Sequence, residues 1–295
     1  MKTRTIAAPL ALAALLAGTA ACGGTAQAGG PSHAPGTSNA ANKLTITAHD
    51  MAYTIKGSPR PGHLDITFDN ADDAAHEAQI VRLKDGKTIK DVLADMKKGG
   101  EQAAAGDIAG DPEQQAYGTP ALLYGGQKTE VVSDTMQPGT YGVVCFLPGP
   151  DGMPHVAMGM AAQFTVRGKE SGRTPKSDGT VELGDHGITV PDGFGSGTYE
   201  VTNTGTTPHS FSVARLDGSL DELFGYIGGQ FAQNKPIDGG PGSLVAGVAT
   251  LKPGQSAYLV LDLKPGHYGY VSTVQGQDPS DTDYARGLHG EFTIG

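Results

Sequence analysis

The sequence has only two cysteines in 295 residues, Cys22 and Cys145, so it can form at most one disulfide. It has no cluster of basic residues, and its formal net charge of -10 argues against nucleic acid as a partner. Beyond the N-terminal region, no apolar run is long enough to span a bilayer. The carboxylates are scattered, and we find neither a Ser/His/Asp arrangement nor a phosphate-cradling glycine loop.

The N-terminus has the layout of a bacterial export signal. Lys2 and Arg4 precede an apolar run over 6–17 that is too short for a membrane span. Small residues then lead to Cys22, a pattern that resembles the lipobox of bacterial lipoproteins. The resemblance implies that residues 1–22 are a signal peptide, that Cys22 is lipidated, and that the protein is extracytoplasmic and membrane-anchored. The alternative is cleavage at an Ala-x-Ala-like site, which would give a secreted protein.

Residues 23–42 are mostly small and polar, which predicts a flexible tether between the anchor and the folded part. With Cys22 lipidated, Cys145 has no disulfide partner. A lone thiol in an oxidising compartment is either buried as a small hydrophobic residue or held by a metal.

The remaining chain contains one pattern twice, which predicts domains at 43–168 and 180–295 joined by a polar linker at 169–179. Both copies contain alternating strand patterns, an Asn-containing turn followed by a histidine, and a closing Pro-Gly-x-Tyr-Gly strand. His76 and His209 are the equivalent histidines. The 45 glycines and 19 prolines suit a protein of many short strands and turns.

Each copy also predicts one short helix after the strand that follows its histidine. Thr88 with Asp91, and Ser219 with Glu222, have the spacing of a capping box. An amphipathic apolar stripe follows each cap. We therefore expect an all-β protein of two tandem Greek-key β-sandwiches, each with a short inserted helix. The Tyr-Gly-x-x-Cys strand and the loop after it resemble the cupredoxin family, strongly in the first copy and weakly in the second.

Cys145, His155 and Met160 lie in one short stretch and supply a thiolate, an imidazole and a thioether. These are three of the four ligands of a blue-copper site, in which two His and one Cys lie in a plane and Met is a long axial ligand. His76 is the natural second histidine. By resemblance, His76, Cys145 and His155 are equatorial and Met160 is axial around a single type 1 copper.

The loop is most similar to the type 1 loop of copper nitrite reductases, although it is about one residue longer before His155. In that family a histidine beside the copper cysteine leads to a catalytic copper centre. Here the neighbours of Cys145 are Val144 and Phe146. The resemblance therefore implies an electron carrier, not an enzyme, with a redox partner that the sequence does not identify.

The second copy lacks the ligand set. Ser272 replaces the cysteine, Leu288 replaces Met160, and no histidine stands at the position of His155. His209 remains, and we expect it to be satisfied by backbone atoms. We therefore predict a copper-free second domain with a structural or docking role.

Three other functions remain open. A metal-free binding or assembly protein would hold the Cys145 sulfur more than about 4 Å from both histidine side chains, outside ligand distance. A copper-handling protein would use Met153, Met158 and Met160 as soft Cu(I) ligands. An enzyme would need a second metal centre, for which the sequence offers no ligands.

Overall fold

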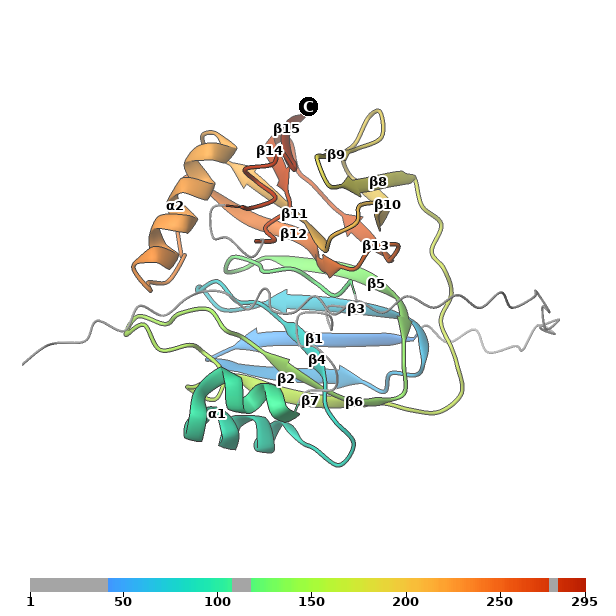
Figure 1. Cartoon of the computed structure of the whole chain (residues 1–295). Coiled ribbons are helices and arrows are strands. Elements are labelled where there is room, and N and C mark those ends of the chain that lie inside the picture. The colour runs from blue at the N-terminus through green and yellow to red at the C-terminus, as the bar shows by residue number, and fades with distance from the viewer. Residues whose placement is uncertain (1–41, 108–117, 276–280) are drawn as a thin grey trace, which may run out of the picture.

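The computed structural model describes residues 42–107, 118–275 and 281–295, and within them it is a β-protein with two α-helices (Figure 1). The first half contains β1 Lys43–His49, β2 Ala52–Gly57, β3 Gly62–Asn70, β4 Gln79–Arg82, α1 Ile89–Ala104, the 3-10 turn η1 Ala105–Asp107, β5 Lys128–Met136, β6 Gly139–Val144 and β7 Ala161–Val166. The second half contains β8 Gly179–Gly184, β9 Gly187–Thr189, β10 Gly197–Asn203, β11 His209–Leu216, α2 Leu220–Ala232, β12 Gly242–Leu251, β13 Ser256–Leu261, β14 Gly266–Val271 and β15 His289–Ile294.

The two halves repeat the same topology. In each half the first strand pairs in parallel with the third, β1 with β3 and β8 with β10, while the other pairs are antiparallel. A second layer packs across the first, made of β4, β6 and β7 in one half and of β12, β11, β14 and β15 in the other. This arrangement confirms the all-β class and two tandem β-sandwiches, each with one inserted helix.

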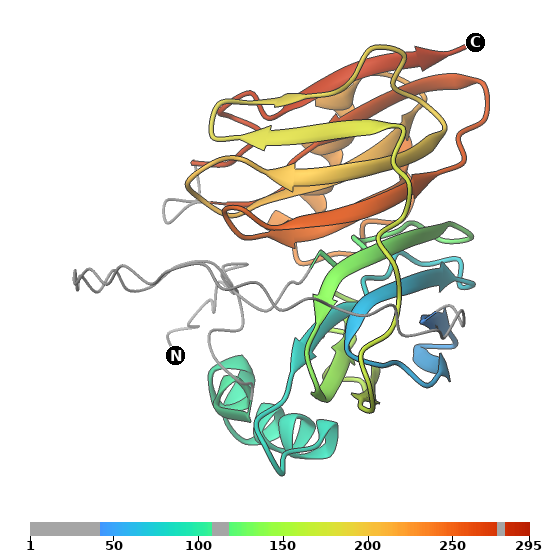
Figure 2. The same ribbon diagram turned by 90° about the vertical axis from the view of Figure 1, so that its right-hand side faces the viewer.

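One layer is continuous through both halves. Its eight strands run in the order β2-β1-β3-β5-β13-β10-β8-β9, and Figure 2 shows the sheet passing from one half to the other. The junction is the antiparallel pair β5–β13, in which Val131 lies opposite Leu259. Both residues are fully buried, so each half hides an edge of the other from water.

The opposite layer is joined by residues 119–124, which hold the place that β12 holds in the second half. The Ala121 N–H donates to Gly247 O (3.0 Å), and the Ala249 N–H donates to Thr119 O (2.7 Å). Leu123 then exchanges both backbone hydrogen bonds with His76 (2.9 and 3.0 Å). We call residues 119–124 the seam segment. It links the backbone of His76 directly to the second half.

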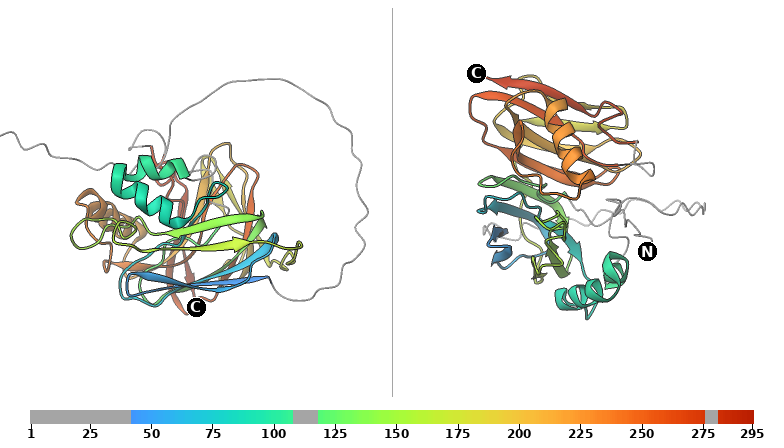
Figure 3. Two further views of the ribbon diagram at one scale, coloured as in Figure 1. Left: turned by 90° about the horizontal axis from the view of Figure 1, so that it is seen from below. Right: turned by 90° about the vertical axis from the view of Figure 1, so that its left-hand side faces the viewer.

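The hydrophobic core also crosses the junction. One cluster of buried side chains includes Cys145 and Met160 from the first half with Leu223 and Ile237 from the second. The helices lie outside the second layer (Figure 3). The first residue of each helix packs against a glycine of the second layer. A Cβ at Gly142 of β6 would lie 2.9 Å from Ile89 of α1, and a Cβ at Gly269 of β14 would lie 2.6 Å from Leu220 of α2. Glycine is therefore needed for this close approach.

Only one of the two predicted capping boxes is complete. At α2, the Ser219 side chain accepts the Glu222 N–H, and Glu222 accepts the Ser219 N–H. At α1, Asp91 accepts the Thr88 N–H, but the Thr88 hydroxyl donates to Asp91 and does not cap a helix N–H.

The ends of the predicted domains are defined by local contacts. Asn42, the last residue of the predicted tether, is already buried, and its side chain bonds to Arg60 and His63. In the linker, Ser171 pairs with Gly62, so this segment runs along the first half. Among the described residues, no helix has both the length and the apolar character to cross a membrane. Cys22, the signal peptide and the rest of the tether lie outside the described residues.

Candidate metal centre

His76 is positioned by the turn that precedes β4. The Asn70 side chain donates to Ala74 O (2.9 Å) and Leu123 O (3.1 Å), and it accepts the N–H of Asp72 (3.3 Å). The backbone of His76 pairs with Leu123 on the seam segment. An asparagine at the end of β3 therefore ties the turn to the seam and directs His76 inward, where its side chain is fully buried.

Cys145 and His155 are held on one loop by its own backbone bonds. Cys145 directly follows β6, and its carbonyl accepts the Val156 N–H (2.7 Å). The His155 N–H donates to Leu147 O (3.0 Å), and the loop between them forms a small hairpin closed by the Pro148–Pro154 bridge. These hydrogen bonds hold the loop in a fixed conformation. His155 itself is only 4% exposed, although Met153 and Met158 of the same loop are exposed.

The side chains of His76, Cys145 and His155 converge on one buried point. The two Nδ1 atoms lie 3.1 Å apart, and the Cys145 Sγ lies 3.3 Å from Nδ1 of His155 and 3.9 Å from Nδ1 of His76. Among the described residues, this is the one group of three or more His, Cys, Asp or Glu side chains close enough to share a metal ion. A metal-free binding protein was expected to hold the sulfur more than about 4 Å from both histidine side chains. Both sulfur–nitrogen distances are shorter than that.

The spacing of these three atoms fits a trigonal metal. With metal–nitrogen bonds of about 2.0 Å and a metal–sulfur bond of about 2.3 Å in one plane, the nitrogens are separated by about 3.5 Å and each nitrogen from sulfur by about 3.7 Å. The distances between the three donor atoms are within about half an ångström of these values. Two imidazoles and one thiolate can therefore hold a metal with small side-chain shifts.

Burial sets the protonation of the metal-free cluster. It raises the pKa of the Cys145 thiol to about 12, with Glu77 adding to the effect. Burial also lowers the pKa of His155 to about 4, with help from His76, and lowers the pKa of His76 despite the nearby Asp72. At neutral pH the cluster therefore holds two neutral imidazoles and a thiol. A metal that binds here must displace the thiol proton.

Met160 is completely buried in the same apolar cluster as Cys145. Its N–H donates to the carbonyl of His155 (3.0 Å), so the turn from His155 to Met160 is closed by the backbone. The neighbouring Met158 and Met153 are 40% and 46% exposed. Met160 is thus the loop methionine that lies inside the protein with the cluster, and its axial role stays a prediction.

The residues on either side of the ligands also contact each other. A Glu77 carboxylate oxygen accepts the N–H of Phe146, the residue after Cys145 (2.8 Å). The Tyr53 hydroxyl donates to the Glu77 carbonyl. The first bond connects the residue after His76 to the residue after Cys145, and the second connects the His76 segment to β2.

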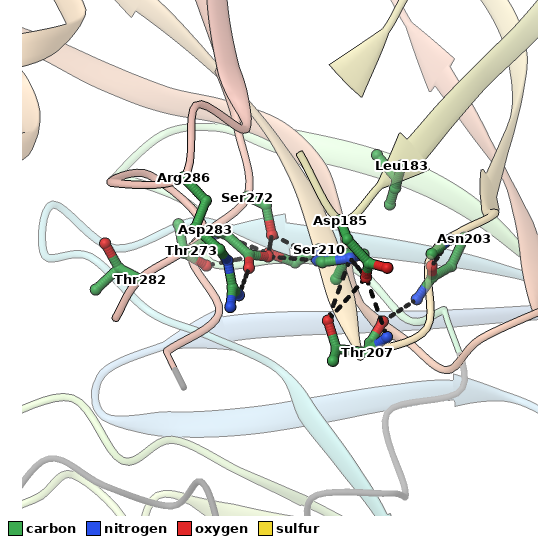
Figure 4. A network of polar contacts seen from close by, with 12 residues as sticks. Leu183, Asp185, Asn203, Thr207, Ser210, Ser272, Thr273, Thr282, Asp283 and Arg286 are labelled. Atoms are coloured by element: carbon green, nitrogen blue, oxygen red, sulfur yellow. Dashed lines mark hydrogen bonds and ion pairs between the residues drawn. The ribbon is translucent and has the colours of Figure 1, made fainter. Parts of the chain in front are cut away.

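The second half fills the equivalent position with a polar network (Figure 4). Asp283 takes the place of His155, since the Asp283 N–H bonds to Val274 O just as the His155 N–H bonds to Leu147 O. Leu288 takes the place of Met160, and its N–H donates to Asp283 O. Asp283 then accepts hydrogen bonds from Ser272 and from Nδ1 of His209 (2.7 Å).

His209 therefore lies between two carboxylates. Asp185 contacts its Nε2 (3.1 Å), and Arg286 donates to the other oxygen of Asp283. Burial alone would lower the pKa of His209, but Asp283 and Asp185 outweigh it and raise the pKa. The expectation that backbone atoms satisfy His209 is wrong, because side-chain carboxylates do. The ion pair of His209 and Asp283 therefore takes the place of His76 and His155, and Ser272 takes the place of Cys145.

Sequence reasoning missed three carboxylates that contact His76 or His209. Asp72 lies 2.9 Å from Nε2 of His76. Asp185 and Asp283 contact the two ring nitrogens of His209. The spacing of Asp72, four residues before His76 in a turn, was the available signal. Asp283 could have been identified by aligning the two loops at their C-terminal ends. Leu288 follows Asp283 by five residues, as Met160 follows His155.

No known protein family profile matches the chain, and no curated protein matches it. Similar solved structures include a dithionite-reduced auracyanin from the photosynthetic bacterium Roseiflexus castenholzii, which is 22% identical with a TM-score of 0.27 and covers 40% of this chain and 95% of that one. A multicopper oxidase is 16% identical with a TM-score of 0.24, over 86% of this chain and 88% of that one. A copper-containing nitrite reductase from Thermus scotoductus SA-01 is 14% identical with a TM-score of 0.22, over 85% of this chain and 60% of that one.

Proposed function

We propose that the first half binds one type 1 copper and that the protein carries single electrons. The observation that carries the proposal is the buried convergence of His76, Cys145 and His155, with nitrogen and sulfur atoms at 3.1 to 3.9 Å from one another. A thiolate and two imidazoles in a plane are the donor set of blue-copper sites. When bound, the copper would supply a one-electron couple between Cu(II) and Cu(I).

The chain contributes rigidity and dryness to this chemistry. The loop from Cys145 to Met160 is closed by its own backbone hydrogen bonds, and the seam segment holds His76 from the other side. The sulfur lies in a buried apolar cluster that includes side chains of both halves. A ligand set held this firmly changes little when the metal changes charge, and this small reorganisation is what rapid electron transfer needs.

The proposal is of a carrier and not of an enzyme. Val144 and Phe146 flank the thiol, so no histidine beside Cys145 leads to a further metal. Among the described residues, the second half offers an ion pair where the first offers ligands. We propose that the second half is copper-free. Its seam with the first half gives it a structural role.

Copper handling is the second candidate, and one observation favours it. Met153 and Met158 are the exposed large hydrophobic side chains of the described residues, and both lie on the metal loop. Surface thioethers are suitable ligands for Cu(I). A protein that passes Cu(I) to acceptors would release it readily to a chelator, whereas a carrier retains its copper in both oxidation states.

We also propose that Cys22 carries lipid and anchors the protein outside the cytoplasm, because the residues before it have the pattern of an export signal. Mass spectrometry of the N-terminal peptide from the membrane fraction tests this. A diacylglycerol-modified peptide that begins at Cys22 is expected. An unmodified N-terminus beyond Cys22, recovered from the medium, would show a secreted protein instead.

The copper proposal is tested by adding one equivalent of Cu(II) to the metal-free protein and recording its visible spectrum. We expect an intense thiolate-to-copper charge-transfer band that is absent from Cys145→Ser and lost or shifted in His155→Gln. His186→Gln is the matched control, because His186 is exposed in the second half and should leave the band unchanged. Copper binding without the band would favour copper handling. The absence of binding would favour a metal-free protein.

A further inference from the structure

The imidazole of His76 has a carboxylate on the side that faces away from the cluster. Its Nδ1 points to Cys145 and His155, and its Nε2 contacts Asp72 Oδ2 at 2.9 Å. The other oxygen of Asp72 accepts the N–H of Asp50 (2.8 Å) in the turn between β1 and β2. The carboxylate is thus fixed by a backbone bond and is only 19% exposed. Nothing in the proposed ligand set requires it.

The second half makes the same contact with a residue from the opposite turn. Asp185 follows β8 as Asp50 follows β1, and it contacts Nε2 of His209 at 3.1 Å. The residue in the place of Asp72 is Gly205. A carboxylate therefore lies on Nε2 of the buried histidine in both halves, although the residue that provides it differs.

The space beside Nε2 admits only one of these two side chains. A Cβ at Gly205 would lie 2.6 Å from Asp185 Oδ1 and 2.7 Å from His209 Nε2. In the first half Asp72 fills that space, and the Asp50 side chain is 98% exposed. Each half therefore places one carboxylate on Nε2 of its histidine, from Asp72 in the first half and from Asp185 in the second. The contact is common to both halves, although the residue that makes it is not.

We propose that Asp72 is a positioning residue that sets the orientation and the reduction potential of the metal centre through His76. The inference rests on the copper function proposed above. With Nε2–H donating to Asp72, the lone pair of Nδ1 faces the cluster, which is the tautomer that a metal ligand needs. The negative charge of Asp72 makes the imidazole a stronger donor and favours the more highly charged Cu(II) form.

The test compares Asp72→Asn, Asp72→Ala and Asp73→Asn. Asp73 is the neighbouring residue, its side chain is exposed, and its substitution removes the same charge from the same turn. We expect a higher reduction potential in Asp72→Asn than in Asp73→Asn, because only Asp72 contacts the ligand. Asp72→Ala also removes the hydrogen bond to His76. We expect it to bind Zn(II), a redox-inert probe of the same site, 10–100-fold more weakly than Asp73→Asn does.

A second measurement needs no metal. Nitrogen NMR of the metal-free protein should show His76 as the Nε2–H tautomer in the wild type and in Asp73→Asn, and as a mixture in Asp72→Ala. Equal potentials in Asp72→Asn and Asp73→Asn, with an unchanged tautomer in Asp72→Ala, would overturn the proposal. If the wild type forms no charge-transfer band, the copper function fails, and the tautomer and Zn(II) affinity still decide whether Asp72 positions His76.

Discussion

Single residues in the metal centre are held by backbone bonds more than by contacts among themselves. The carbonyl of Cys145 accepts the Val156 N–H, the carbonyl of Leu147 accepts the His155 N–H, and Leu123 pairs with His76 on both sides. The three donor atoms therefore reach near-ligand distances through the hydrogen bonds of the folded backbone. This arrangement places most of the ordering cost of the site on folding and not on metal binding.

Met160→Leu tests the axial ligand. Leucine has nearly the same volume and stands at the equivalent position in the second half, as the buried Leu288, so the stability should change by less than about 1.5 kcal/mol. We expect the variant to keep its copper and its charge-transfer band but to have a higher reduction potential, because a donor that favours Cu(II) is lost. Spectroelectrochemistry measures this, and an unchanged potential would show Met160 to be core filler only.

The polar network of the second half predicts a pH dependence. Since the pKa of His209 is raised in the folded state, its contribution to stability is complete below its unfolded pKa of about 6.5 and is lost as pH rises through the folded pKa. The pKa of Asp283 is lowered, because its bonds to His209 and Ser272 outweigh burial, so its contribution is lost only as pH falls through that lowered value.

Denaturant unfolding of the metal-free protein across the neutral and alkaline range measures the effect. His76, His155 and Cys145 also have shifted pKa values, but they add the same slope to the wild type and to His209→Gln, so the difference between the two profiles reports on His209. We expect His209 to contribute a loss of no more than about 1.4 kcal/mol per pH unit to the wild-type profile. His209→Gln should show a flatter profile, and parallel profiles would contradict a protonated His209.

At the scale of elements, the two helix starts differ in a way that mutation can measure. The Ser219 hydroxyl accepts the Glu222 N–H in a complete capping box, whereas the Thr88 hydroxyl donates to Asp91. Ser219→Ala should therefore cost about 1 kcal/mol, and Thr88→Ala should cost less, because the bond from the Thr88 N–H to Asp91 survives. Denaturant unfolding of both variants checks this, and a larger loss at Thr88 would contradict it.

The strands and helices were predictable because their signals are local. Alternating apolar residues, the Asn turn before His76 and the Pro-Gly-x-Tyr-Gly strand before Cys145 each depend on a few neighbouring positions. The meeting of His76 with Cys145 and His155 followed from the cupredoxin resemblance, since the residues are 69 and 79 positions apart from His76. The burial of the His155 side chain was not predicted, because it depends on packing between segments that are distant in the sequence.

Which carboxylate reaches each histidine could not be predicted. The first half has an Asp in both turns, Asp50 and Asp72, and only the turn geometry decides that Asp72 faces His76. In the second half Asp185 makes the equivalent contact from the other turn. A choice of this kind depends on the conformation of the two turns, and sequence spacing does not resolve it.

At the scale of the whole molecule, the two halves behave as one folded unit. They share an eight-stranded sheet, a core that contains Cys145, and hydrogen bonds across the seam segment. Further contacts hold the turns around the metal centre: Asp238 of the second half accepts the Ala75 N–H (2.6 Å), and the Asn234 side chain donates to Gly152 O (2.6 Å). The second half therefore supports the backbone beside His76 and the metal loop directly.

This continuity predicts one cooperative unfolding transition that responds to metal. Zn(II) binding at His76, Cys145 and His155 should stabilise the entire protein, by about 2.7 kcal/mol when free Zn(II) is at 100 times its dissociation constant. Calorimetry should show a single peak whose van't Hoff and calorimetric enthalpies agree, and the whole peak should move upward with Zn(II).

Cys145→Ser is the control for that experiment, because it removes a ligand while leaving the seam intact. Its transition should remain single and should move much less with Zn(II). Two transitions in the wild type, of which only one moves with Zn(II), would mean that the halves unfold separately. The shared sheet would then be too weak to couple them, and the second half could not influence the metal centre through the seam segment.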